Sequence, residues 1–160
     1  MAILTIHHWD DQQELGVREL RRVARGPVII FTYDPDVCGQ MWLYRDYLPE
    51  AAALDRATFP SIETLASWLG GSVSIEPVLN RRDTPDWTLG SFWAHPERVL
   101  DDAARRATSA FARMKPALVN RVAGQVEQDL RDGTWDLRNG ELRALNEYDV
   151  GMRMIVGHRS

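Results

Sequence analysis

The sequence predicts an α/β fold in which a single domain spans residues 1–160. Two apolar runs, Ala2–Ile6 and Val28–Thr32, have the composition of buried strands. A stretch with helical periodicity, Gln12–Arg25, lies between them. Because a strand, an amphipathic helix and a second strand form a right-handed crossover, we expect the two strands to pair in parallel.

The first predicted strand, Ala2–Ile6, is apolar along nearly its whole length. Such runs are typical of strands that are buried on both faces of a sheet. In the helix that follows, Asp10 or Asp11 is placed to cap the first N–H groups. The buried stripe of this helix is expected to consist of Val17, Leu20 and Ala24, and to be widened by Val23.

The middle of the chain continues the alternation of helix and strand. The segment Tyr33–Thr58 is too long for a structureless loop, so part of it is expected to be helical. A helix is predicted over Ser61–Leu69, where apolar residues share one stripe. The strand Val73–Val78 alternates in polarity, and Pro77 favours a position at the edge of the sheet.

A loop and helical insertion is expected over residues 79–147, before the final strand. Its helices are predicted over Asp102–Met114 and Ala117–Arg131, each with an apolar stripe. The final strand, Asp149–Val156, alternates and so has two distinct faces. One of these faces is expected to carry Val150, Met152, Met154 and Val156.

The charge and composition narrow the range of partners. The net charge of −4 gives no general attraction to nucleic acid or anionic lipid, so neither is expected as a partner. No apolar run approaches the length of a membrane span. Cys38 is the single cysteine, which excludes a disulfide within one chain and fits a reducing compartment. The sequence also begins without a basic leader, and a cytoplasmic location is therefore expected.

The first candidate site residues, His7, His8 and Trp9, directly follow the first strand. In open α/β sheets, ligands bind beyond the carboxyl ends of the strands, so these side chains are expected to line a pocket. A metal site is not predicted, because adjacent residues at a strand end point in different directions and no second histidine or cysteine cluster lies nearby. The structural alternative for the segment is capping of the next helix by its aspartates.

Further candidates follow the second strand. Tyr33 and Asp34 occupy the same kind of position beyond a strand end. The segment Asp34–Asp36 also has the chemistry of a turn, so both interpretations stay open. Trp42 and Tyr44 come next, although aromatic side chains more often pack in a core than form a ligand cage.

The segment Ala2–Asp36 resembles small-molecule class I S-adenosylmethionine-dependent methyltransferases. In that family a fourth strand ends in a loop of the His-Trp-Asp type, a helix of the form Leu-x-Glu-x-x-Arg-Val follows, and a fifth strand comes after a tight turn. The matching segments here are His8–Asp10, Arg18–Val23 and Val28–Thr32. Many members have Pro-Gly-Gly before the later strand, where this chain has the segment Arg25–Pro27.

The resemblance implies the C-terminal half of a Rossmann-like methyltransferase sheet. The family's strand order is 3-2-1-4-5-7-6 with the seventh strand antiparallel. The four strands of this chain would therefore form a half-sheet of order 4-5-7-6, with helices on its faces. The first three strands would be absent, together with the Gly-rich loop and the ribose-binding acid of the cofactor site.

The resemblance also implies a function, which is methyl transfer from S-adenosylmethionine to a small-molecule acceptor. His7 or His8 would act as the catalytic base, and Trp9 would bind the cofactor. The substrate-binding residues would be Tyr33, Asp34, Trp42 and Tyr44. Without the cofactor motif, the isolated chain is expected to bind S-adenosylmethionine poorly and to be inactive.

Two other functions fit the same residues, and one expectation concerns assembly. The chain could be a non-catalytic dimerising or interaction module derived from the methyltransferase fold, or an independent α/β binding domain. In a complete sheet of the family, Ala2–Ile6 would have neighbours on both sides. Because an open strand edge exposes N–H and C=O groups, we expect a homodimer or a partner chain to cover it.

Overall fold

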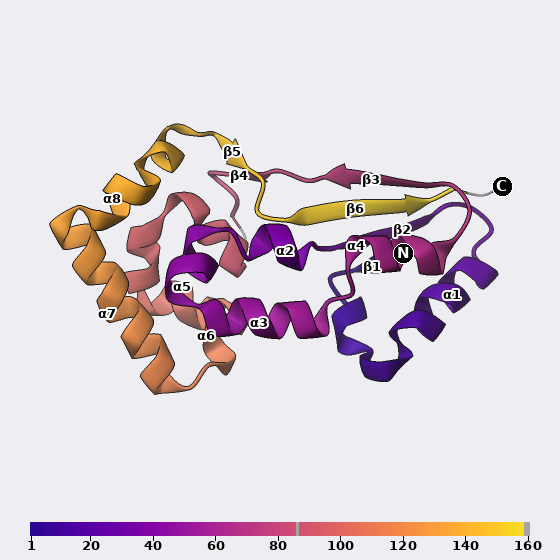
Figure 1. The fold of residues 1–160 in the computed structure, drawn as a ribbon, viewed down its shortest axis with the longest axis horizontal. Coiled ribbons are helices and arrows are strands. Elements are labelled where there is room, and N and C mark those ends of the chain that lie inside the picture. The colour runs from indigo at the N-terminus through magenta and orange to yellow at the C-terminus, as the bar shows by residue number, and fades with distance from the viewer. Residues whose placement is uncertain (86, 159–160) are drawn as a thin grey trace. The chain divides into compact units, whose positions relative to one another are not determined.

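A four-stranded sheet forms the centre of the first of two units into which the chain divides (Figure 1). The computed structural model describes residues 1–85 and 87–158. The first unit contains residues 1–39, 50–78 and those from 151 onward, and the second contains 40–49 and 79–150. The expected insertion, residues 79–147, thus belongs to the second unit.

The sheet has the order β1-β2-β6-β3 (Figure 1). The short strand β1 (Ala2–Ile3) pairs in parallel with β2 (Val28–Tyr33). The last strand, β6 (Met152–Gly157), lies antiparallel to β2 on one side and to β3 (Val73–Pro77) on the other. The prediction of a mixed α/β fold is therefore confirmed.

The first strand is shorter and less buried than expected. The prediction covered Ala2–Ile6, but Leu4 adopts a left-handed φ of 46°, which ends the extended conformation after Ile3. One face of the strand is buried at Ala2, whereas 53% of Ile3 is exposed on the other. The expectation of burial on both faces was wrong, because only one face of the sheet is covered by helices at this point.

Two helices cover that face of the sheet. They are α1 (Gln13–Val23) and α4 (Ile62–Leu69), which contact each other. Burial of each large aliphatic side chain between the helices and the strands contributes about 1.5–3 kcal/mol. The buried residues of this core are Ala2, Ile6, Val17, Val28, Ile30, Ile62, Leu65, Leu69 and Ile155.

The N-terminus of α4 is capped by a side chain, whereas the predicted cap of α1 is absent. The Ser61 hydroxyl accepts a hydrogen bond from the Thr64 N–H at 3.1 Å and so caps α4. The first helix, α1, has Gln12 at its N-cap and no side-chain cap. The predicted capping by Asp10 or Asp11 is absent, because both residues lie in a 3-10 turn, Asp10–Gln12, that precedes α1.

The opposite face of the sheet, which we call the open sheet face, is apolar along β1, β2 and β6, is only partly covered, and carries Ser74 and Glu76 on β3. Side chains alternate along β2 and β6, so Ile30 and Ile155 point to the helices while their neighbours point to the other side. The predicted strand Asp149–Val156 starts later than expected, at Met152, so Val150 lies outside it. The open sheet face carries Ile3, Ile29, Phe31, Tyr33, Met152, Met154 and Val156.

Between β2 and α4, the first unit also contains α2 (Pro35–Cys38) and most of α3 (Pro49–Thr58). Gly151 lies against the first of these helices with a left-handed φ of 91°. A Cβ atom at this position would lie 2.8 Å from the Cys38 backbone nitrogen and 2.9 Å from the Asp34 carbonyl oxygen. Both the φ angle and the close approach therefore require glycine before β6.

The second unit is mainly helical. It contains α5 (Asp102–Ala107), α6 (Ser109–Arg113), α7 (Pro116–Asp132) and α8 (Thr134–Asn139). A short antiparallel pair joins β4 (Asn80–Arg81) to β5 (Glu147–Tyr148). Turns of 3-10 helix cover Leu89–Ala94, Pro96–Leu100 and Gly140–Ala144, and a turn of π-helix covers Leu43–Tyr47.

The predicted helix Asp102–Met114 is broken in two at Thr108. This residue has an extended ψ of 114°, and its hydroxyl donates to the Ala104 carbonyl oxygen at 2.9 Å. The next predicted helix, Ala117–Arg131, is present as α7 and is one residue longer at each end. None of the described helices combines the length and the apolar character that crossing a membrane requires.

Candidate functional site

The turn that carries His7 and His8 lies directly after β1. It is a 3-10 turn, Ile6–His8, whose first residue is buried in the core under α1. Two residues with left-handed φ flank it, Leu4 at 46° and Asp10 at 47°. This conformation costs roughly 1–2 kcal/mol for a residue with a side chain, and such strain is often found at functional sites.

The structure brings both histidines together with two aromatic residues, and we call this group the His7 cluster. The rings of His7 and His8 have centroids 3.9 Å apart. Phe59 stacks on His7, with centroids 4.1 Å apart and planes that differ by 20°. Tyr33 meets the same phenylalanine edge-on at 6.2 Å. The cluster therefore collects residues from the turn after β1, from the last position of β2 and from the position after α3.

Phe59 reaches this position because the end of α3 is tied to the start of α1. The Gln13 side-chain amide donates to the Thr58 carbonyl oxygen at 3.0 Å. The Phe59 N–H donates to the Asp55 carbonyl oxygen at 2.8 Å, which continues the helical turn by one residue. Sequence reasoning missed Phe59, since nothing local marks it as a neighbour of a residue 52 positions earlier.

The His7 cluster has the chemistry of a proton acceptor beside a flat apolar wall. A neutral imidazole can take a proton near pH 7. His7 is half-buried and has its ring plane held by Phe59, whereas His8 is exposed to solvent. The exposed imidazole is accessible to a small molecule that lies against the aromatic rings.

Trp9 packs away from this cluster, over α1. Its ring covers Gly16, where a Cβ atom would lie only 2.5 Å from the Trp9 Cε3 atom. The indole also packs against the core of the first unit. It borders a shallow groove of about 440 Å³, which we call the α1 groove, whose lining residues are Trp9, Gln12, Leu15, Gly16, Glu19, Leu20 and Val23.

Asp34 has a clear structural task at the start of α2. Its carboxylate accepts hydrogen bonds from the N–H groups of Asp36, at 3.1 Å, and Val37, at 3.4 Å. The guanidinium of Arg153 on β6 lies 3.8 Å from the same carboxylate. The segment Asp34–Asp36 was expected either to bind a ligand or to form a turn. The contacts of Asp34 in the structure are those of a turn-forming residue.

The predicted substrate residues Trp42 and Tyr44 lie in the second unit and are buried. The indole N–H of Trp42 donates to the Trp93 carbonyl oxygen at 2.9 Å. Its ring also meets the rings of Tyr47 and Trp135 edge-on, at 5.7 Å and 5.5 Å. These contacts are those of core packing, and a substrate role for the two residues stays a prediction.

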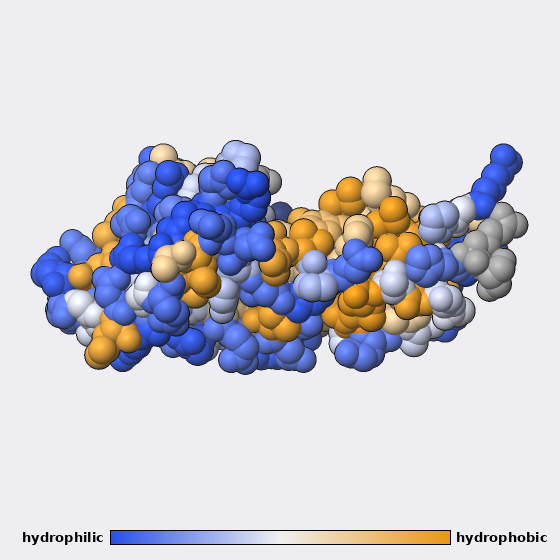
Figure 2. Space-filling model, turned by 90° about the horizontal axis from the view of Figure 1, so that it is seen from above, coloured by the Kyte–Doolittle hydropathy of each residue, from blue (hydrophilic) through white to orange (hydrophobic). Residues whose placement is uncertain are grey.

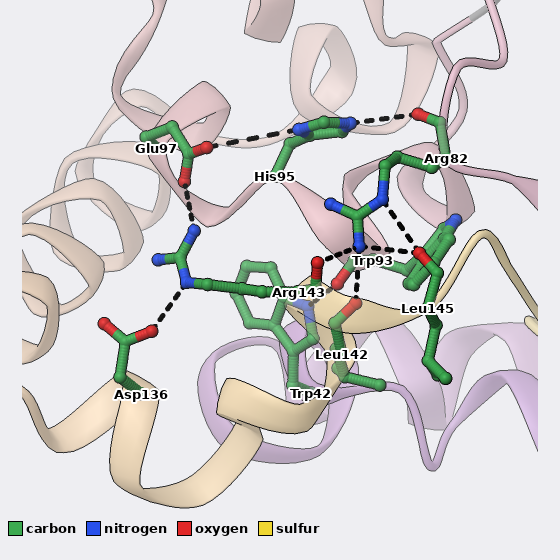
Figure 3. Close-up of polar contacts among 9 residues, drawn as sticks. All are labelled: Trp42, Arg82, Trp93, His95, Glu97, Asp136, Leu142, Arg143 and Leu145. Atoms are coloured by element: carbon green, nitrogen blue, oxygen red, sulfur yellow. Dashed lines mark hydrogen bonds and ion pairs between the residues drawn. The ribbon is translucent and has the colours of Figure 1, made fainter.

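The second unit also contains a dense polar cluster that the sequence did not indicate (Figure 3). The Arg82 guanidinium donates to the carbonyl oxygens of Leu142 and Leu145, at 2.9 Å and 2.6 Å, and also to that of Arg143. It lies 5.6 Å from the centre of the Trp93 ring. Arg82 therefore closes the 3-10 turn Gly140–Ala144 by satisfying the carbonyl groups at its end.

Two more side chains extend this cluster. The His95 Nε2 atom lies 2.9 Å from the Arg82 carbonyl oxygen, and Arg143 pairs with Asp136 at 2.6 Å and with Glu97 at 3.5 Å (Figure 3). The hydrogen bond from Arg143 to Asp136 raises the pKa of the guanidinium. The side chains of Arg82, His95 and Arg143 each contact an oxygen of the protein, so the cluster holds the segments of the unit together.

We searched the described residues for side chains that could bind a metal ion together. Within residues 1–85 and 87–158, no three histidine, cysteine, aspartate or glutamate side chains come together in an arrangement that could hold an ion. The candidate site is the His7 cluster, whose side chains carry imidazole, phenyl and phenol groups.

Comparison with known proteins matches this α/β architecture to one crystal structure. No protein-family model matches the sequence, and no curated protein matches it closely. The matched structure comes from Anabaena variabilis and is described as a "Putative methyltransferase from antibiotic biosynthesis pathway". It superposes with a TM-score of 0.86 and 30% sequence identity, over 98% of this chain and 64% of that chain. This chain thus spans just under two thirds of the Anabaena protein.

Proposed function

We propose that this chain is the acceptor-side part of an S-adenosylmethionine-dependent methyltransferase that acts on a small molecule. The likeness of 98% of the chain to the Anabaena protein, at 30% identity, is the observation that carries the proposal. The position of the His7 cluster supports it, because ligands of α/β sheets bind beyond the carboxyl ends of parallel strands.

The strands support the same assignment. We equate β1, β2, β3 and β6 with the fourth, fifth, sixth and seventh strands of the class I sheet. The spatial order β1-β2-β6-β3, with β6 antiparallel to both neighbours, then corresponds to the order 4-5-7-6. This correspondence makes the four strands one contiguous half of the family's sheet.

Among the described residues, none forms the Gly-rich loop that this family uses to bind its cofactor. The Gly-rich loop of the family follows a parallel strand and lets the backbone approach the cofactor. Within the described residues, the glycines with left-handed φ are Gly70, Gly71, Gly133 and Gly151. The first three follow helices and the last precedes β6, so none occupies the required place. Binding of S-adenosylmethionine would need further polypeptide.

The role that we propose for this chain is to orient the acceptor and to take its proton. Methyl transfer from a sulfonium requires alignment of the acceptor and exclusion of water, and a base assists when the acceptor is a hydroxyl or an amine. The exposed His8 imidazole is the proposed base. His7 is a positioning residue, since its ring touches His8 and is itself held by Phe59.

A chimeric protein tests the proposal. In the Anabaena protein, the region that superposes on this chain is replaced by the full 160 residues, and binding of S-adenosylmethionine is measured by calorimetry, followed by transfer of a radioactive methyl group to pools of small hydroxyl and amine compounds. We expect the chimera to bind the cofactor as the intact Anabaena protein does. A folded chimera that binds none, beside an Anabaena protein that does, would refute the proposal.

A further inference from the structure

We propose that the His7 cluster binds an uncharged aromatic hydroxyl compound, whose ring lies against Phe59 and Tyr33 and whose hydroxyl donates a hydrogen bond to His8. The proposal rests on the proposed function, because it names the class of acceptor that the same site would take. Three properties of the cluster support it, which are its flat walls, its exposed imidazole and the charge beside it.

The walls of the cluster are flat rings. His7 covers one face of the Phe59 ring, with centroids 4.1 Å apart, and Tyr33 meets that ring edge-on at 6.2 Å. Phe59 and Tyr33 are both only partly buried, so part of each ring is open to solvent. Aromatic rings attract one another in offset-stacked and edge-to-face arrangements. These walls therefore favour a planar aromatic compound over a saturated one of the same size.

The backbone holds both rings in place. Tyr33 is the last residue of β2, where it pairs with Met152 of β6. The Phe59 N–H donates to the Asp55 carbonyl oxygen at 2.8 Å, which fixes its position at the end of α3. Because the walls are already in position, a ligand does not have to order them when it binds. A small compound can therefore use most of its contact area for affinity.

The exposed His8 imidazole supplies the polar contact. Its ring centroid lies 3.9 Å from that of His7, and its side chain is open to solvent. A neutral imidazole has one nitrogen that accepts a hydrogen bond. A phenolic hydroxyl, with a pKa of about 10, holds its proton less tightly than an alkyl hydroxyl and is the stronger donor. A hydroxyl bonded in this way is also placed to give up its proton to the imidazole.

The charge beside the cluster disfavours anionic compounds. Asp10 is exposed and follows His8 by two residues, a span of at most about 7 Å of chain. This span is shorter than the Debye length of about 8 Å at physiological ionic strength, so a carboxylate or phosphate at the site would be repelled. A protonated amine is not repelled, but its nitrogen has no lone pair to accept a methyl group. An uncharged aromatic hydroxyl compound satisfies the walls, the imidazole and the charge together.

Titration of the 160-residue chain with three ring compounds, followed by nuclear magnetic resonance, tests the proposal without a cofactor. The compounds are 2-naphthol, its saturated analogue decahydro-2-naphthol, and 2-naphthoate. We expect 2-naphthol to bind at least tenfold more tightly than the other two. Its ring current should shift the imidazole proton resonances of His7 and His8. Phe59→Leu should weaken binding at least fivefold, whereas Phe59→Tyr, which keeps the ring, should leave the affinity within twofold.

Adsorption to another apolar surface of the first unit is the outcome that a control variant detects. Figure 2 shows hydrophobic residues gathered over the part of the molecule that holds β3 and β6. Ile75 of β3 is 45% exposed, and Ile75→Ser should leave the affinity for 2-naphthol within twofold. Resonance shifts confined to β3 and β6 would overturn the proposal. So would equal binding of the saturated analogue, or no binding of 2-naphthol up to its solubility limit.

The chimera separates this proposal from the proposed function. A chimera that binds S-adenosylmethionine and methylates only aliphatic hydroxyl or amine compounds would keep the proposed function and overturn the aromatic hydroxyl assignment. A chain that binds 2-naphthol at the His7 cluster, beside a folded chimera that binds no cofactor, would support the aromatic binding site and refute methyl transfer. The two proposals can therefore fail separately.

Discussion

The imidazole of His7 stacks on the phenyl ring of Phe59, with centroids 4.1 Å apart and ring planes that differ by 20°. This contact connects the turn after β1 to the residue that follows α3. It orients the His7 ring. Because the centroids of the two imidazoles lie 3.9 Å apart, it also restricts the orientations that the His8 ring can adopt. The pair therefore decides how the candidate site is arranged, and its removal gives the first prediction.

Phe59→Ala should destabilise the first unit by about 1–3 kcal/mol, because the ring stacks on His7, touches Tyr33 and is only partly exposed. Urea unfolding measures the loss, and the imidazole proton resonances of His7 should shift in the same variant. Phe59→Tyr, which keeps the ring, is the control. Unchanged His7 resonances in Phe59→Ala would contradict the proposed stacking.

His8→Ala should leave the free energy of unfolding within about 0.5 kcal/mol, because the side chain is exposed. In the chimera, the same change should lower methyl transfer by about 10²–10⁴-fold if His8 removes the acceptor's proton. His8→Gln keeps the size and polarity and should show the same loss. Equal losses of stability and of transfer would assign His8 a structural role instead.

Gly16→Ala should destabilise the chain, since a Cβ atom at that position would come within 2.5 Å of the Trp9 ring. Gly124→Ala on α7 is the matched control, because a Cβ atom there meets nothing within 4 Å. It should stabilise the chain by up to about 1 kcal/mol through helix propensity. Thermal unfolding of both variants checks the prediction, and opposite shifts of melting temperature are expected.

Tyr47→Phe should destabilise the second unit by about 1–2 kcal/mol at pH 7, because the Tyr47 hydroxyl donates to the Asp129 carboxylate at 2.7 Å. Burial, followed by this hydrogen bond, raises the pKa of the Tyr47 phenol above its ordinary value of about 10. The folded state thus holds the phenolic proton more tightly than the unfolded state does.

The contribution of Tyr47 is therefore fully present below about pH 10 and declines as the pH rises further. The stabilities of the wild-type chain and of Tyr47→Phe should converge above that pH. Urea unfolding at pH 7, 9 and 10.5 measures the difference. A difference that grows with pH would show that the hydroxyl is not held in its protonated form.

The isolated 160-residue chain should not bind S-adenosylmethionine measurably, because its described glycines do not form the loop that approaches this cofactor. Isothermal titration with millimolar cofactor is the measurement. A clear isotherm in the low micromolar range would show that the chain holds a complete site by another route.

Periodicity in the sequence was sufficient to locate most of the elements. The stripes of α1, α4 and α7 and the apolar run of β2 are local patterns, and the helices and strands formed where these patterns predicted them, with ends that differ by one or two residues at most sites. The position of His7 and His8 beyond a strand end was also visible, because a strand's end is a local feature, whereas Tyr33 is the last residue of β2 and does not lie beyond it.

Only the tertiary structure decided what these residues face. Phe59 joined the His7 cluster through a contact between distant segments, Trp9 turned onto Gly16 and away from the histidines, and Ile3 remained exposed although its neighbours are apolar. Periodicity reports which side of an element is apolar, and it carries no information on whether another element covers that side. Burial is a property of the pair of packed surfaces, and so it was settled only when α1 and α4 covered one face of the sheet.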